Sequence, residues 1–180
     1  LKGQHGDEDI INTLDVIGKR RGCLIKGGEV VTGGYCGVYL LDTSSVEITG
    51  GKVEGYRYAV RGNGSNYSIT LGNDDGNVST DSPILIGNGT NAIKVDKNFK
   101  FYDGILKGKQ VAYVASSALD TPTGYVPYIS NDGTYETAIL KKEIEVTLNQ
   151  ESYVYTGSAI TPNITVSWQG TTLVAGTDYE

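Results

Sequence analysis

Three polar residues recur at matching places in the first two thirds of the chain. Asp42, Asn63 and Asp96 each stand four residues after a small apolar residue. If the segments are strands stacked in register, about 4.8 Å apart, the three side chains form a vertical row. Stacked carboxylates bind Ca²⁺ or act as acid and base on a polysaccharide. Asp and Asn at a repeated corner also hydrogen-bond their own backbone, and because the row contains a neutral Asn we favour this structural interpretation.

Tyrosines are the second group with possible chemistry. Tyr35, Tyr39, Tyr56 and Tyr58 lie close together in the sequence, and exposed rings of this kind stack on sugar rings. We take these four as the candidate ligand-binding residues. The alternative is cross-strand packing, which tyrosines also favour on the surface of a β-sheet. Three further tyrosines, which we also expect to be exposed, lie in or beside the same segments: Tyr67, Tyr102 and Tyr113.

Metal and thiol chemistry have few residues available. The chain has two cysteines and one histidine, His5, too few for a four-ligand zinc site. The stretch GNDDGNVSTD lacks EF-hand spacing, because the twelfth position from Asn73 is Ile84. We therefore predict no metal and no cofactor. Cys23 falls on an inward-facing apolar row, so we expect a buried free thiol there and a faster-reacting Cys36, with a Cys23–Cys36 disulfide as the alternative.

An internal repeat predicts the fold. The segments LIKGGEVVTGG (24–34), EITGGKVEG (47–55) and KFYDGILKG (100–108) align without gaps over their first seven residues. In each, two apolar residues stand five positions apart with a Gly-Gly or Asp-Gly turn between them: Ile25 and Val30, Ile48 and Val53, Phe101 and Leu106. This pattern indicates a strand, a corner and another strand.

A second motif follows in YCGVYLLD, YRYAVRGN, TNAIKVDK and QVAYVASS. Its matching small residues are Val38, Ala59, Ala92 and Ala112, separated by 21, 33 and 20 residues. These distances suit one coil of a parallel β-helix, and the longest absorbs the insertion GNDDGNVSTDSP. We predict an all-β chain with a short right-handed parallel β-helix of three to four coils over residues 1–115, and Ile25, Ile48 and Phe101 in one interior row.

Charge and composition exclude several functions. The chain has 15 Lys and Arg against 21 Asp and Glu, a net charge of −6, and one basic cluster, GKRRG, at Lys19, Arg20 and Arg21. We interpret that cluster as a solvated turn and predict no nucleic-acid partner. No apolar run of about 18 residues predicts a membrane span, and no leader peptide opens the chain. A chain that starts LKGQHGDED and stops at AGTDYE is expected to be a piece of a longer protein.

The C-terminal third differs in composition and predicts a second module. Residues 143–180 hold five acids and no Lys or Arg. Residues 116–142 contain Pro122 and Pro127, which cannot donate ladder hydrogen bonds, so we expect a cap and linker that wraps the open end of the coils.

The segment YVYTGSAITPNITVSWQGTTLVAGTDYE resembles the small immunoglobulin-like repeats of Gram-positive bacterial surface proteins. The matching positions are Tyr155, Thr156, Gly157, Ile160, Pro162, Val166, Gly170, Leu173, Gly176, Thr177, Asp178 and Tyr179. In such repeats the chain continues after Asp-Tyr into further strands, so the resemblance implies that 143–180 is an incomplete immunoglobulin-like β-sandwich. It also implies an extracellular location at the cell surface or cell wall, and it provides no catalytic residues.

These observations predict a non-catalytic structural or adhesive module of a bacterial cell-surface protein. The expected partner is a surface glycan or a host protein, and the sequence leaves the oligomeric state open. The alternative is a carbohydrate-active β-helix, either a polysaccharide lyase or a glycoside hydrolase, or a carbohydrate-binding module. The residues available for such catalysis are Asp42, Asp96, Arg57 and Arg61.

Overall fold

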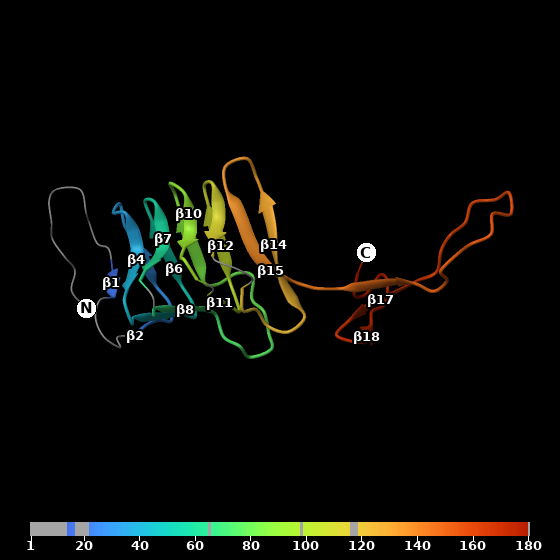
Figure 1. The fold of residues 1–180 in the computed structure, drawn as a ribbon, viewed down its shortest axis with the longest axis horizontal. Helices are drawn as coiled ribbons and strands as arrows, with labels where there is room; N and C mark the ends of the chain where they lie inside the picture. Colours follow the sequence, from blue (N-terminus) through green and yellow to red (C-terminus); the bar gives the residue numbers. More distant parts are fainter. Residues whose placement is uncertain (1–13, 17–21, 65, 98, 116–118, 180) are drawn as a thin grey trace. The chain divides into compact units, whose positions relative to one another are not determined.

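The computed structural model describes residues 14–16, 22–64, 66–97, 99–115 and 119–179, and every regular element in these ranges is a β-strand (Figure 1). The chain divides into two compact units, one comprising residues up to 122 with 127–140, the other 123–126 with 141–180. Within the described ranges, no helix has the length and hydrophobicity needed to cross a bilayer. The chain is therefore all-β, as its composition predicts.

Three mainly parallel sheets build the first unit. Sheet A contains, in spatial order, β1 (Leu14–Val16), β4 (Cys36–Leu41), β7 (Tyr58–Asn63), β10 (Asn91–Lys94) and β13 (Val111–Val114). Sheet B contains β11 (Lys100–Phe101), β8 (Ser68–Leu71), β5 (Ser45–Ile48) and β2 (Gly22–Ile25). Sheet C contains β14 (Tyr125–Asn131), β15 (Glu136–Lys142), β12 (Ile105–Gly108), β9 (Ile84–Gly87), β6 (Lys52–Gly55) and β3 (Glu29–Val31).

The chain visits sheets B, C and A in turn and then starts again, so β2–β3–β4, β5–β6–β7, β8–β9–β10 and β11–β12–β13 are four turns of a β-solenoid. The predicted coiled fold is confirmed. Figure 1 shows the sheet A strands β4, β7 and β10 side by side. Stacking neighbouring turns gives each apolar residue a partner above and below, which is how a solenoid obtains a continuous core.

The interior rows follow the predicted alignment. In sheet B, Ile25 pairs with Ile48, Ile48 with Leu71, and Leu71 with Phe101. Ile48, Leu71 and Phe101 are completely buried. The predicted row of Ile25, Ile48 and Phe101 is confirmed, with Leu71 as an additional member from the third turn.

The second sequence motif is shifted by one residue in its first copy. Val38 pairs with Val60, not with Ala59, and Val60 pairs with Ile93. The predicted equivalence of Val38 and Ala59 is therefore wrong. Ala59 and Ala92 directly precede the paired residues Val60 and Ile93, and all four are fully buried. Two consecutive residues therefore lie in the core on β7 and again on β10. A simple inward–outward alternation misplaces the register at such a point.

Glycines form the corners of the solenoid, and either the backbone φ angle or the lack of space for a Cβ atom requires glycine there. Gly28, Gly51 and Gly104, in the predicted Gly-Gly and Asp-Gly turns, all have positive φ. Between sheets C and A the constraint is space, because a Cβ on Gly55 or Gly87 would lie 1.8 or 1.7 Å from a backbone carbonyl oxygen. The corner interpretation of the glycines therefore agrees with the structure.

The predicted insertion lies between β8 and β9, at residues 72–83. The buried Asp103 carboxylate holds both ends of this loop, accepting hydrogen bonds from the Asn73 N–H at 2.7 Å and the Ser79 N–H at 2.6 Å. Asp75 Oδ1 accepts from the Asn77 N–H at 2.9 Å. These two acids therefore order the loop, as Asp side chains commonly do in turns.

A hairpin of β14 and β15 completes sheet C. Residues Glu136 to Ala138 of β15 pair antiparallel with β12, the sheet C strand of the last turn. Pro127 lies in β14, which is the edge strand, where a missing N–H is tolerated. Asp132 accepts hydrogen bonds from the N–H groups of Tyr135 and Thr134, and these bonds lower the pKa of its carboxyl. The segment after the last turn thus occupies the open edge of sheet C.

The second unit contains one small antiparallel sheet, sheet D, of β16 (Glu145–Leu148), β17 (Ile164–Trp168) and β18 (Thr171–Thr172). Gln169 and Gly170, both with positive φ, form a two-residue turn between β17 and β18. The Trp168 Nε1–H donates to the Gly124 carbonyl at 2.9 Å. The alternating strand and glycine turn noted in the sequence are present, while a second sheet that would make a sandwich is not among the described residues.

Candidate functional site

The most concentrated group of functional side chains lies on sheet A and its adjoining corner. Tyr35 immediately precedes β4, and Arg57 occupies the corresponding place before β7, because Cys36 pairs with Tyr58. Further along, Tyr39 pairs with Arg61, and Arg61 with Lys94. We call the resulting group the tyrosine–arginine cluster, and it comprises Tyr35, Tyr39, Arg57, Tyr58, Arg61 and Lys94.

Tyr35 is the centre of this cluster. Its hydroxyl oxygen accepts hydrogen bonds from Nη1 of Arg61 at 2.9 Å and from Nη1 of Arg57 at 3.2 Å. Both guanidinium groups also lie 5.3 Å from the centre of the Tyr35 ring. The Tyr35 and Tyr58 rings meet edge to face at 5.4 Å. These contacts combine cation–π attraction with hydrogen bonding and hold both arginines against tyrosine rings.

Tyr58 forms the base of the cluster. Only 1% of its surface is exposed, because three cations cover its ring: Arg57 at 5.5 Å, Arg61 at 5.6 Å and Lys94 at 5.8 Å. Burial by itself would raise the pKa of the Tyr58 phenol. Hydrogen bonds with Thr90 and Tyr35 and the charges of Lys94 and Arg57 outweigh burial, so the pKa is lowered. The environment of this phenol is strongly positive.

Tyr39 joins the cluster through Arg61, whose guanidinium lies 5.9 Å from the Tyr39 ring centre. Its hydroxyl accepts a hydrogen bond from Asn63 at 3.0 Å. Tyr56 is 66% exposed and takes part in none of the ring contacts found in the described ranges. The structure thus brings together three of the four predicted ligand-binding tyrosines, but Tyr58 is covered and cannot offer a free ring face to a sugar.

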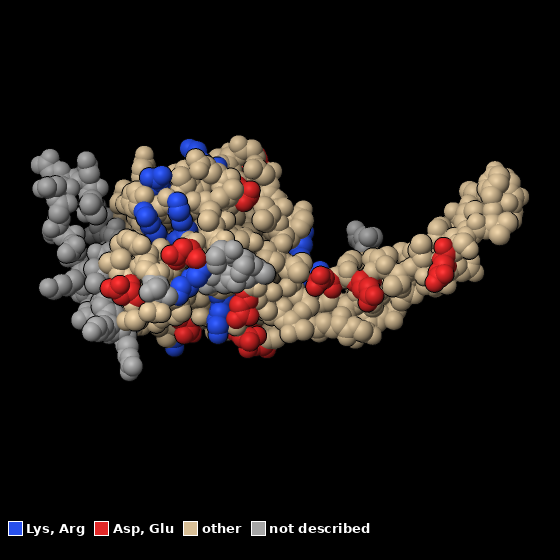
Figure 2. Space-filling model, in the orientation of Figure 1, with Lys and Arg blue, Asp and Glu red and all other residues tan. Residues whose placement is uncertain are grey.

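The cations of the cluster have no acidic partner among the described side chains. Lys52 by contrast pairs with Glu29 and Glu54, on sheet C. Figure 2 shows Lys and Arg side chains gathered over β4, β7 and β10. The chain as a whole is acidic, so this concentration of unpaired positive charge is a local feature.

The expected row of Asp42, Asn63 and Asp96 does not form. Asn63 pairs with Leu41, which places Asp42 one residue further along the chain, and Asn63 donates to Tyr39. Asp96 accepts a hydrogen bond from the Tyr67 hydroxyl, and its own N–H donates to the same oxygen at 2.9 Å. Asn63 and Asp96 thus bind tyrosine hydroxyl groups, in place of the hydrogen bonds to their own backbone that we expected. The described ranges contain no group of three or more His, Cys, Asp or Glu side chains that could hold a metal ion.

Two of the further tyrosines are part of the core. Tyr67 is 2% exposed and Tyr102 is 8% exposed, while Tyr113 packs edge to face on Phe99 at 5.7 Å. The expectation that Tyr67 and Tyr102 are exposed is therefore wrong. Their rings belong to the interior of the solenoid, and large aromatic rings contribute strongly to the burial of a core.

The two cysteines are free thiols, and the disulfide alternative is not present. Cys23 pairs with the buried Val46, as the inward-row alignment predicts, yet it is only partly buried, and this burial raises the pKa of its thiol. Cys36 is 2% exposed, so the expectation that Cys36 reacts faster is wrong. Cys23 lies on β2, which is the end strand of sheet B among the strands that the structure describes. His5 and the Lys19–Arg20–Arg21 cluster lie outside the described residues.

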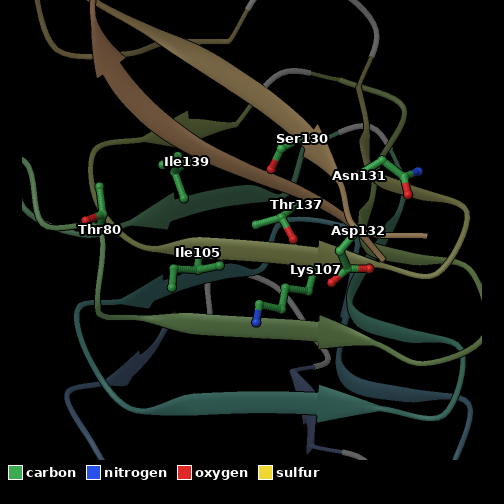
Figure 3. A pocket seen from close by; sticks show the side chains of 8 residues that line it. All are labelled: Thr80, Ile105, Lys107, Ser130, Asn131, Asp132, Thr137 and Ile139. Carbon is green, nitrogen blue, oxygen red and sulfur yellow. The ribbon is translucent and has the colours of Figure 1, made fainter. Parts of the chain in front are cut away.

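A separate hollow of about 480 Å³ lies on the outer side of sheet C (Figure 3). Ile105, Lys107, Thr137 and Ile139 come from β12 and β15, and the other lining residues are Thr80, Ser130, Asn131 and Asp132. The Asp132 carboxylate is used by the hairpin turn. The hollow is shallow, and its polar lining offers one cation, Lys107, where the tyrosine–arginine cluster offers three.

Comparison with protein-family models finds no match, and comparisons with curated proteins and with solved structures find no significant similarity. The sequence reasoning named Arg57 and Arg61 only as candidates for catalysis, and it missed Lys94. The repeat itself contained the signal, since Arg61 and Lys94 each stand two residues after the alanine of the second motif, Ala59 or Ala92.

Proposed function

We propose that this chain is a structural or adhesive module of a bacterial cell-surface protein, with the tyrosine–arginine cluster as its binding surface. The observation that carries this proposal is the composition of the cluster. It offers guanidinium, ammonium and phenol groups, and within the described ranges its cations form no ion pair with a carboxylate. Such a site is suited to holding a ligand. A polysaccharide hydrolase needs a pair of acids flanking the bond that it cleaves.

The mechanical side of the proposal rests on the solenoid. Four stacked turns with apolar rows and glycine corners make a stable β-element that requires no bound group for its core. The extracellular, cell-surface part of the proposal is supported by the resemblance of residues 143–180 to bacterial surface repeats. Together these features suit a module joined end to end with others and displaying a binding face.

An enzyme assay tests the non-catalytic part of the proposal. The protein is incubated with pectin, alginate and glycosaminoglycans while unsaturated products and reducing ends are followed. We expect neither product to accumulate above a heat-denatured control. Cleavage that disappears in Asp42→Ala or Asp96→Ala would overturn the proposal in favour of a polysaccharide lyase or glycoside hydrolase.

A further inference from the structure

We infer that the tyrosine–arginine cluster binds an anionic glycan through its carboxylate or sulfate groups. This inference rests on the proposed adhesive function and specifies the chemistry of the ligand. It differs from the expectation of a neutral sugar stacked on exposed tyrosine rings, because the Tyr58 ring is buried and two guanidinium groups lie against the Tyr35 ring, which is 42% exposed.

The first argument is the covering of the rings. Arg57 and Arg61 both lie 5.3 Å from the Tyr35 ring centre, and the three cations of the cluster lie within 6 Å of the Tyr58 ring centre. A sugar ring approaching Tyr58 meets cations instead of a free aromatic face. The groups presented to a ligand are therefore N–H donors with positive charge, which bind anions.

The second argument concerns the donors that remain. A guanidinium has five N–H donors, and Arg57 and Arg61 each use one of their Nη1 donors on Tyr35. Contact with the tyrosines also restricts both side chains before a ligand arrives, which reduces the entropy lost on binding. An arginine with most of its donors available and no acidic partner recognises carboxylate or sulfate oxygens by paired hydrogen bonds.

The third argument is the spacing of the positive charges. Arg61 and Lys94 are paired positions on neighbouring strands of sheet A, so their backbones are about 4.8 Å apart. Arg57 precedes β7 at the adjoining corner. Strand pairing places five residues in one row across sheet A: Asp15, Tyr39, Arg61, Lys94 and Val114. The backbone of Asp15, the one acid in this row, lies two strands from Arg61. Cations on successive turns suit a linear polymer whose negative charges repeat along its length.

A nucleic acid fits this surface less well than a glycan does. Single-stranded nucleic acids bind by stacking their bases on free aromatic faces, and Tyr58 has none. Affinity for a duplex rises with the number of phosphates neutralised, and here three cations stand on a chain with a net charge of −6.

Affinity electrophoresis of the 180-residue chain tests the inference. Separate native gels contain polygalacturonate as the carboxylated probe, heparin as the sulfated probe, dextran as the neutral probe and single-stranded DNA. We expect retardation by polygalacturonate, heparin or both, weakening as salt is added, and none by dextran. The gel that retards the protein identifies whether carboxylate or sulfate is the preferred group.

Two double variants of equal charge separate the cluster from general electrostatics. Arg57→Gln/Arg61→Gln removes the two cluster arginines, and Lys26→Gln/Lys109→Gln removes two exposed lysines elsewhere on the solenoid. We expect the affinity of the first variant to fall about tenfold or more and that of the second to change less than about twofold. Melting temperatures of the variants are compared. If the arginine variant does not fold, it is replaced by Lys94→Gln, at the one exposed position of β10.

Any of three results would overturn the inference. The two double variants could lose affinity equally, DNA could retain the protein more tightly than the glycans do, or dextran could retain it as well as the anionic probes. Retardation by no probe would also overturn it. These results remove the anionic ligand of the cluster but leave the non-catalytic structural module standing, since such a module needs no anionic glycan. The proposed function fails on a different readout, the release of polysaccharide fragments.

Discussion

The solenoid and the three-stranded sheet D use similar residues but bury them to different degrees. In the solenoid, Ile48 and its paired neighbours are completely buried. In sheet D, Val146 pairs with Val166 and Leu148 with Ile164, so four apolar residues share one face. Val166 is 3% exposed, whereas Val146 and Leu148 are 56% and 58% exposed.

This difference shows that strand pairing alone does not make a core. Pairing satisfies the backbone and brings apolar side chains onto one face, but a second layer must cover that face to remove it from water. The solenoid provides that layer itself, because sheets A, B and C face one interior. The second unit provides it at Val166 and leaves most of the remaining apolar face of sheet D accessible.

The largest expected effect comes from placing a charge in each apolar face. Ile48→Asp should reduce the free energy of unfolding of the solenoid by about 4 kcal/mol or more, because an unpaired carboxylate enters a closed core. The matched change Val146→Asp, on the exposed face, should cost about 1 kcal/mol or less.

Urea unfolding measures both changes. The single Trp168 reports the second unit by fluorescence, and far-UV circular dichroism reports mainly the more numerous strands of the solenoid. Similar losses in the two variants would mean that the two faces are equally buried in solution, contrary to the comparison.

A smaller effect is expected at the corners of the solenoid. Gly87→Ala places a methyl group 1.7 Å from the Asn91 carbonyl oxygen, so the backbone must shift, at a cost of about 2–3 kcal/mol. Gly27→Ala is the control, since a Cβ there meets no atom within 4 Å and no positive φ is required. Thermal melts of the two variants compare them, and an unchanged melting temperature for Gly87→Ala would contradict this packing of the corner.

The smallest effect concerns a buried phenol and its pH dependence. Burial and the hydrogen bond to Asp96 raise the pKa of Tyr67 well above its ordinary value. The phenol therefore contributes stability that is fully present below about pH 10 and is lost as pH rises beyond it. Tyr67→Phe should cost about 1 kcal/mol at neutral pH and reduce the alkaline loss. Burial also raises the pKa values of Tyr102 and Tyr113, so part of that loss should remain.

Urea unfolding at pH 8 and pH 11 measures this effect. Tyr155→Phe, at an exposed position of the second unit, is the control and should leave the pH dependence unchanged. If Tyr67→Phe loses as much stability between the two pH values as the parent chain, the phenol does not contribute to the alkaline transition.

The repeat predicted the solenoid because each turn had the same local requirements. The apolar pair five residues apart and the glycine corner recur in three turns, and the rows through Ile48 and Phe101 formed as aligned. The first motif had no recognised copy in the third turn, because β8 is followed by the insertion at 72–83 and not by the short corner of the other turns. The second motif did mark this turn, at Ala92. The one-residue error at Val38 arose where two successive residues of a strand both point into the core, which breaks the period of two.

The candidate site was only partly predictable. The four tyrosines were identified from their types, and three of them belong to the cluster. That Tyr58 is covered, and that Arg61 and Lys94 lie beside one another, depends on pairing between strands that are more than 30 residues apart in the sequence. Residue type therefore indicated where binding chemistry is available, but not which groups a ligand meets.

The sequence by itself determined the local elements: short strands, glycine corners and the apolar period that requires neighbouring turns to stack. These depend on φ, on side-chain volume and on the alternation of residues along a strand, all of which are local. Only the tertiary structure decided that Tyr67 is core, that Cys36 is more buried than Cys23, and that cations cover the tyrosine rings. Burial and charge environment are properties of the residues that the fold brings together, and in a solenoid those residues come from the turns above and below.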